Sequence, residues 1–396
     1  MRWLSWLLLT LCSFVWAQER QVIPLRYEVS WDEEELWGIL LGVSIPARPT
    51  EPKSVKLPSV SDASFFVAKF ADGNRLFAVA KKRNKFILYA DTNGNNSLTD
   101  ERPFEMRQRA NKMVAGPIPM LINLGDKKVT RHVGVMFLEI KGKRVPRRSS
   151  LFLTAASRWT GGLNWEGKPT PVTVLDRNCD GVITEDDLLI LGSWTTQGKQ
   201  LILSHELMEL IVTGRYGGQR FPAKVQAGID GKFFRFDVSP DGEKLTFEPL
   251  KVQAATVQFN GERISLMVEG SSGKWLLEGQ GGQLIAPVGD FQTLSVRLAR
   301  KDKRGRIWLV SANAFGPAAP RFSVPISGTT FDIEPLKLTL HYGQRGDQCE
   351  FWLDIKTANG MKVDNLVTSS GSPPEPKLRL SSPEGKVIAE PKFHYG

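Results

Sequence analysis

The sequence is poor in cysteine and histidine, and it lacks the short motifs of several common catalytic sites. Its 396 residues include three cysteines and four histidines, which are scattered along the chain. It contains no Gly-x-Ser-x-Gly turn, no glycine-rich phosphate loop ending in Lys-Ser or Lys-Thr, and no Cys-x-x-Cys pair. These absences argue against phosphate-loop and dithiol chemistry. A Ser–His–Asp triad or a carboxylate pair that only the fold brings together stays open.

Long hydrophobic runs are also missing, except at the start of the chain. An apolar run over Leu4–Trp16 follows Arg2 and leads to the small residue Ala17. This arrangement is typical of a signal peptide, so we expect residues 1–17 to be removed before Gln18. No later stretch is long and apolar enough to cross a bilayer. We therefore expect a secreted protein, periplasmic or extracellular, whose net charge falls from +10 to +9 because one Arg and no acid is lost.

The mature chain keeps only two cysteines, Cys179 and Cys349. Export makes a disulfide bond chemically possible, but two cysteines do not form a disulfide framework. We expect the Cys179 side chain to face outward, and whether it pairs with Cys349 stays open.

Most of the chain has the pattern of short β-strands. Apolar runs such as Ser64–Phe70, Arg75–Ala80 and Lys85–Tyr89 are separated by Gly, Asn, Asp and Pro, which form turns. His205–Val212 is the best helix candidate, because its apolar residues share one helical face. The sequence therefore predicts an all-β fold built from several antiparallel sheet or sandwich domains.

Changes in composition predict four domains after the signal peptide. A basic stretch at Lys141–Arg148 marks one boundary, and regular β patterns begin beyond Pro249 and again at Pro335. The expected domains are residues 18–146, 147–250, 251–332 and 333–396. In the last of these, four short runs resemble the strands of immunoglobulin-like units in exported bacterial proteins: Leu336–Tyr342, Cys349–Ile355, Lys377–Leu380 and Val387–Phe393.

The most informative stretch is Asp176–Asp187, which we name the second loop. Oxygen-bearing side chains occupy its first, third, fifth, ninth and twelfth places, and glycine occupies the sixth. Ile183, at the eighth place, is expected to anchor the loop to a core. Calcium prefers six to eight oxygen ligands, and one loop can surround it when alternate side chains point inward. The candidate ligands are Asp176, Asn178, Asp180, the Val182 carbonyl, Thr184 and Asp187.

This stretch resembles the EF-hand loop and, within that group, the dockerin-type loop of secreted bacterial proteins. The resemblance implies calcium as the cofactor. The closing residue is Asp187, where an EF-hand usually has Glu, so we expect modest affinity. Pro169 and Pro171 indicate that a strand, and not a helix, leads into the loop. We therefore expect a calcium loop between strands; an acidic turn without metal is the alternative.

A degraded copy of this loop lies upstream, and we name Asp91–Glu101 the first loop. Its candidate ligands are Asp91, Asn93, Asn95, Ser97, Asp100 and Glu101. Asn96 replaces the glycine, and Arg102 occupies the closing place, so closure must come from Asp100 or Glu101. Both calcium binding and a plain polar hairpin stay open for this loop.

These observations favour an exported calcium-binding structural or interaction protein, with an unknown protein or polysaccharide partner at the cell surface. Basic clusters at Lys81–Lys85, Lys141–Arg148 and Arg297–Arg306 suit solvated turns or contact with an anionic polymer or membrane surface. No nucleic-acid-binding motif is present, so we expect no nucleic-acid partner. The alternative function is a secreted hydrolase that acts on polysaccharide.

Overall fold

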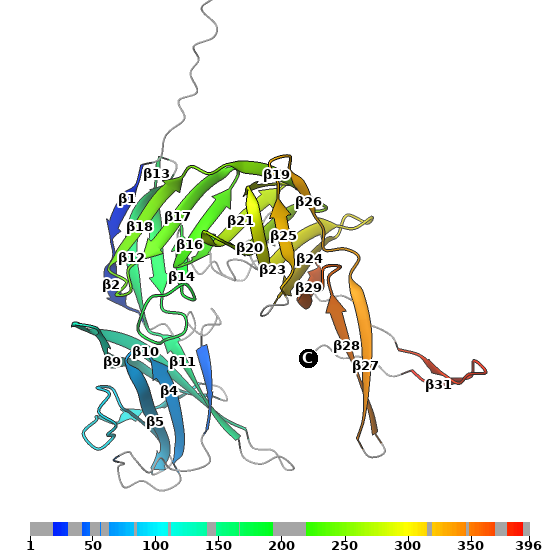
Figure 1. Ribbon diagram of the computed structural model, residues 1–396. Coiled ribbons are helices and arrows are strands. Elements are labelled where there is room, and N and C mark those ends of the chain that lie inside the picture. Colours follow the sequence, from blue (N-terminus) through cyan, green and yellow to red (C-terminus); the bar gives the residue numbers. More distant parts are fainter. Residues whose placement is uncertain are drawn as a thin grey trace, which may run out of the picture.

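A computed structural model shows an all-β protein with several antiparallel sheets, which confirms the predicted fold class (Figure 1). It describes residues 19–30, 42–47, 56, 63–82, 85–109, 112–140, 148–165, 167–192, 219–314, 319–345, 348–368 and 378–390. The expected signal peptide and the helix candidate His205–Val212 lie outside these residues. Within them, no helix is long and apolar enough to span a membrane.

The N-terminal part is a sandwich of two antiparallel sheets. One sheet has the order β3 (Gly42–Pro46), β11 (Arg148–Ala155), β10 (Lys127–Ile140), β9 (Lys112–Leu124) and β8 (Arg107–Arg109). The other comprises β4 (Ser64–Phe70), β5 (Gly73–Lys82), β6 (Lys85–Ala90) and β7 (Phe104–Glu105). Apolar residues of both sheets form the first core, which includes Phe66, Phe77, Ile118 and Phe137.

A second five-stranded sheet follows the sandwich. Its order is β15 (Gln219–Pro222), β14 (Leu188–Leu191), β13 (Lys168–Leu175), β12 (Ser157–Trp165) and β2 (Arg26–Val29). Residues of this sheet, among them Trp159 and Val174, pack with Phe236 and Phe247 of a larger sheet. Together they form the second core.

The larger sheet has 15 strands and is strongly curved (Figure 1). Its main path is β1 (Gln21–Pro24), β18 (Lys244–Leu250), β17 (Lys232–Val238), β16 (Lys224–Ile229), β21 (Gly273–Gln280), β20 (Arg263–Gly270), β23 (Gly289–Lys301), β24 (Ile307–Asn313), β29 (Lys362–Thr368), β28 (Gln348–Lys356) and β27 (Lys337–Arg345).

Four short strands join this path from the side: β19 (Ala254–Phe259), β22 (Gln283–Pro287), β25 (Arg321–Val324) and β26 (Thr329–Phe331). They cover a third core that contains Val257, Leu266, Trp275 and Val296. A separate small hairpin, β30 (Leu380–Ser381) and β31 (Val387–Ala389), lies near the end of the chain.

Hydrogen bonding crosses the three expected boundaries between domains. β10 pairs with β11 across the boundary at 146, β16 pairs with β21 across 250, and β24 pairs with β29 across 332. The strands on either side of each boundary therefore share a sheet, while the hydrophobic interior divides into separate cores.

Candidate metal centre

The second loop joins two neighbouring antiparallel strands. β13 ends at Leu175 and β14 begins at Leu188, and these two residues are paired across the sheet. Leu188–Leu191 continues as a strand and not as a helical turn. The loop therefore lies between strands, as its entering prolines predict, and its flanking elements differ from the two helices of an EF-hand.

Two residues of the second loop adopt left-handed backbone conformations. Cys179, at the fourth place, has a φ of 58°, and Gly181, at the sixth, has a φ of 89°. A Cβ added to Gly181 would lie 2.8 Å from the Ile122 side chain. Glycine is required at this place both by the backbone conformation and by the close approach of β9.

Side chains of the second loop bind its own backbone at regular intervals. Asp176 accepts a hydrogen bond from the Gly181 amide at 2.8 Å, and Asn178 accepts one from the Asp180 amide at 3.0 Å. Asp180 accepts a third from the Val182 amide at 3.0 Å. These bonds curl the backbone around the oxygen atoms of alternate side chains, which is the arrangement that a calcium loop requires.

Asp187, at the twelfth place, connects the two ends of the second loop by hydrogen bonds. Its Oδ1 accepts a hydrogen bond from the Arg177 amide at 2.7 Å. Its Oδ2 accepts bonds from the Thr184 amide at 2.7 Å and from the Thr184 hydroxyl at 3.2 Å. One buried carboxylate thus ties the beginning of the loop to its end.

Asp176 is the least satisfied carboxylate of the second loop. The residue is only 5% exposed, and its buried Oδ1 has no hydrogen-bond partner. Burial and the charges of Asp187 and Asp180 raise the pKa of Asp176 well above its usual range. Burial also raises the pKa of Asp180 and that of Asp187. The loop therefore gathers more negative charge than its hydrogen bonds compensate.

This set of ligands fits a hard cation such as calcium. It combines carboxylate, amide and hydroxyl oxygens around a buried, unpaired Asp176 oxygen. In the described part of the chain, no three carboxylate, imidazole or thiol groups gather closely enough to hold a metal ion. Calcium would therefore need Asn178, Thr184 and the Val182 carbonyl in addition to the carboxylates.

The expectation that Cys179 faces outward was wrong. Its side chain is 1% exposed and belongs to the first core, and burial raises the pKa of its thiol well above the usual range. The Cys179 side chain packs in the sandwich, and its thiol donates to the Asp176 carbonyl at 3.8 Å. Both Cys179 and Cys349 are free, so the structure holds no disulfide between them. Ile183, in contrast, anchors the loop in the second core as predicted.

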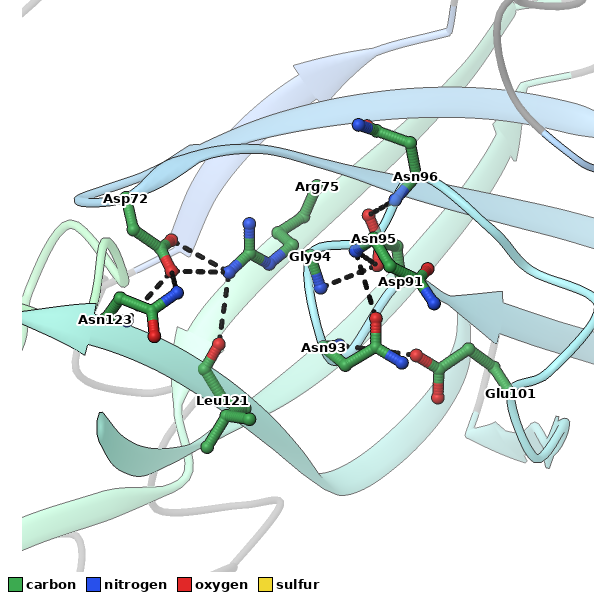
Figure 2. Close-up of polar contacts among 10 residues, drawn as sticks. All are labelled: Asp72, Arg75, Asp91, Asn93, Gly94, Asn95, Asn96, Glu101, Leu121 and Asn123. Carbon is green, nitrogen blue, oxygen red and sulfur yellow. Dashed lines mark hydrogen bonds and ion pairs between the residues drawn. The ribbon is translucent and has the colours of Figure 1, made fainter.

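The first loop has the same backbone design. It joins β6 to β7, which are antiparallel neighbours. Gly94 and Asn96, at its fourth and sixth places, have φ values of 78° and 59°. Asp91 Oδ2 accepts the Asn96 amide at 3.2 Å, and Asn93 accepts the Asn95 amide at 3.0 Å (Figure 2). The corresponding bonds of the second loop connect the same places.

The first loop satisfies its acidic groups internally. Asp91 Oδ1 accepts hydrogen bonds from the Gly94 and Asn95 amides at 2.8 and 3.1 Å, so neither oxygen of this fully buried carboxylate is left unpaired. Asp100 accepts a bond of 2.6 Å from the Asn95 side-chain amide. Hydrogen bonds from Ser97 and Asn95 lower the pKa of Asp100 to about 2.

Closure of the first loop comes from Glu101. Its carboxylate accepts the Thr92 amide at 2.9 Å and the Thr92 hydroxyl at 2.6 Å. This corresponds to the bond between Asp187 and the Arg177 amide. The Ser97 amide donates to Asn95 at 2.9 Å, and the Ser97 hydroxyl lies 3.0 Å from that of Thr99.

A buried arginine lies beside each loop, and the sequence reasoning missed both. Figure 2 shows the Arg75 guanidinium next to Gly94, bound to Asp72 at 2.8 Å and to the Leu121 carbonyl at 3.1 Å. A Cβ on Gly94 would lie 2.5 Å from the Arg75 guanidinium carbon. Arg131 occupies the corresponding neighbourhood of the second loop, where its Nε donates to the Gly181 carbonyl at 3.2 Å.

The sequence carries one signal for Arg131. Residues in a strand alternate between faces, and Arg131 shares its face with Val129 and Val133, both of which are buried. An arginine at a core-facing place is uncommon without a specific partner.

Comparison with protein-family models, with curated proteins and with solved structures found no significant match to this chain.

Proposed function

We propose that this chain is an exported structural or interaction protein in which calcium binds the second loop and stabilises the connection between β13 and β14. The observation that carries the proposal is the buried Asp176 Oδ1, which has no hydrogen-bond partner and lies in a loop with two further acidic ligands, Asp180 and Asp187. A divalent cation would replace the repulsion among these carboxylates with attraction.

The surroundings of the loop support a structural role for calcium. The Ala71 amide, in the turn between β4 and β5, donates to the Asp180 carbonyl at 2.8 Å. The Ile183 amide donates at 2.8 Å to the Pro240 carbonyl, in the turn between β17 and β18. The loop thus contacts elements of the first and the second core. A cation that fixes its shape would also fix this joint.

The remaining parts of the proposal rest on the sequence. Residues 1–17 support export, and a secreted protein meets a calcium concentration that suits a loop of modest affinity, roughly 10⁻⁴ to 10⁻³ M. The partner would be a protein or polysaccharide at the cell surface. The alternative, a secreted hydrolase that acts on polysaccharide, has no specific observation in its favour among the described residues.

Calcium titration of the purified mature chain tests the proposal. Isothermal titration calorimetry should show binding in that affinity range, and the melting temperature should rise with calcium and fall in chelator. Magnesium should have a weaker effect, because it demands a more rigid octahedral site. If neither heat nor melting responds to calcium, the proposal is wrong.

A further inference from the structure

Arg131 connects the second loop to elements of both cores. It lies on β10, in the N-terminal sandwich, and is 5% exposed. Its Nε donates to the Gly181 carbonyl at 3.2 Å, and its Nη2 donates to the Asp241 carbonyl at 2.9 Å. Asp241 lies in the turn between β17 and β18. The guanidinium is therefore held by the backbone of the loop and by that of the neighbouring turn.

Two aromatic rings fix the position of the Arg131 charge. The guanidinium carbon lies 4.6 Å from the centre of the Trp159 ring and 5.6 Å from that of Tyr27. The Tyr27 hydroxyl is in turn hydrogen-bonded to His132 Nδ1 at 3.0 Å. Because the rings and carbonyls hold this cation on several sides, its charge cannot move away from the loop.

A single residue, Gly181, links Arg131 to Asp176 by hydrogen bonds. The Gly181 carbonyl accepts from Arg131, and the Gly181 amide donates to Asp176 Oδ2 at 2.8 Å. No carboxylate of the described residues forms an ion pair with Arg131. Asp176, Asp241 and Glu243 are the acidic groups whose charges act on it, together with the Tyr27 hydroxyl.

We infer that Arg131 is a fixed cation that sets the calcium affinity of the second loop. This inference rests on the proposed function. Without calcium, the Arg131 charge offsets part of the unfavourable negative charge of Asp176. With calcium, the same charge repels the incoming cation, and the repulsion is strong because the site is buried. Arg131 therefore makes the calcium-free loop more stable and also lowers the affinity of the loop for calcium.

The experiment compares calcium binding in the mature wild type with that in Arg131→Met, Arg131→Gln and Arg131→Lys. Calorimetry gives the dissociation constant, circular dichroism in excess calcium checks folding, and melting in chelator gives the stability of the calcium-free form. Arg75→Met serves as a matched control, because Arg75 is the buried arginine beside the other loop.

We expect Arg131→Met and Arg131→Gln to bind calcium about tenfold more tightly than the wild type, since a nearby positive charge has been removed. In chelator, both should melt at a lower temperature. Arg131→Lys keeps the charge and should bind calcium with nearly wild-type affinity. Arg75→Met should lower stability without changing the dissociation constant.

Several outcomes would overturn the inference. Unchanged or weaker binding in the neutral variants would mean that Arg131 only supports the fold. Failure of both neutral variants to fold even in excess calcium would mean the same. A variant that folds only with calcium agrees with the inference. If the wild type binds no calcium, the proposed function is wrong. If the wild type binds calcium and the neutral Arg131 variants bind it with the same affinity, only the inference about Arg131 is wrong.

Discussion

The first and second loops share one backbone design but differ in how they balance charge. In both, the first residue is a buried Asp that accepts the sixth amide, the third side chain accepts the fifth amide, and an acidic residue at the end accepts the second amide. Both also place left-handed residues at the fourth and sixth positions. The fold of such a loop therefore does not by itself reveal whether a metal belongs there.

The difference lies in what surrounds the first Asp. Asp91 accepts three backbone amides, whereas Asp176 accepts one and keeps an unpaired oxygen. At the fifth place, the first loop has Asn95, whose amide group donates to Asp100, and the second loop has Asp180. Amide hydrogens complete the first loop from within. The second loop has a carboxylate in place of such a donor, and we propose that a cation compensates the added charge.

Replacing Asp176 should give the largest effect. Asp176→Asn keeps an acceptor for the Gly181 amide but removes the central charge. It should abolish the calcium-dependent stabilisation, which amounts to about 2.7 kcal/mol at a hundredfold excess over the dissociation constant. Melting in excess calcium and in chelator measures this difference. A calcium response equal to that of the wild type would remove the second loop from consideration as the site.

Replacing Asp91 should destabilise the protein without regard to calcium. Asp91→Ala removes the acceptor of the partly buried Gly94 and Asn96 amides and one of the two acceptors of the Asn95 amide, at a cost of about 1 to 2 kcal/mol. The loss should be the same in calcium and in chelator, as urea denaturation would show. A loss that is clearly larger in calcium would mean that the first loop also binds metal and that the two loops do not differ in this respect.

Adding a carboxylate at the fifth place of the first loop should make its response to calcium more like that of the second loop. In the Asp176→Asn background, Asn95→Asp removes the donor to Asp100 and places two acids side by side. We expect lower stability in chelator and a new calcium-dependent gain of roughly 1 kcal/mol, by the same mass action as in the intact second loop. The Asp176→Asn parent is the control, and an identical response to calcium in both proteins would contradict this expectation.

The smallest effect concerns acid in calcium-free buffer, where Asp100 and Asp176 should respond in opposite directions. The folded-state pKa of Asp100 is lowered to about 2, so its contribution is present above its unfolded value of 3.8 and is lost as the pH falls toward 2. The pKa of Asp176 is raised, so protonation relieves its unfavourable charge as the pH falls. Carboxyl chemical shifts in an NMR titration would report the pKa of each group. Equal pKa values for Asp100 and Asp176 would contradict this expectation.

Much of the fold was predictable because β-strands and their turns have a characteristic local sequence pattern. Alternating apolar residues and turn residues such as Asp72-Gly73-Asn74 identified β4 and β5 directly. The spacing of the second loop likewise predicted its glycine turn and the burial of Ile183.

What the sequence did not reveal depends on contacts between distant segments. The 15-stranded sheet pairs β1 with β18, more than 200 residues later, and no local pattern records that register. The outward orientation expected for Cys179 was wrong, because the loop lies against a core formed by residues 45–155. Arg75 and Arg131 were missed for the same reason, since their partners come from other strands and turns.

The placement of Cys179 and Ile183 has a mechanical consequence. These residues are only four positions apart, yet the first lies in the first core and the second in the second core. Four residues reach at most about 14 Å when fully extended, and a curled loop reaches much less. The segment between Cys179 and Ile183 can therefore extend very little. If the two cores are pulled apart at this point, either a buried side chain leaves its core or the loop unwinds. A bound ion would resist this unwinding and so limit the separation of the two cores.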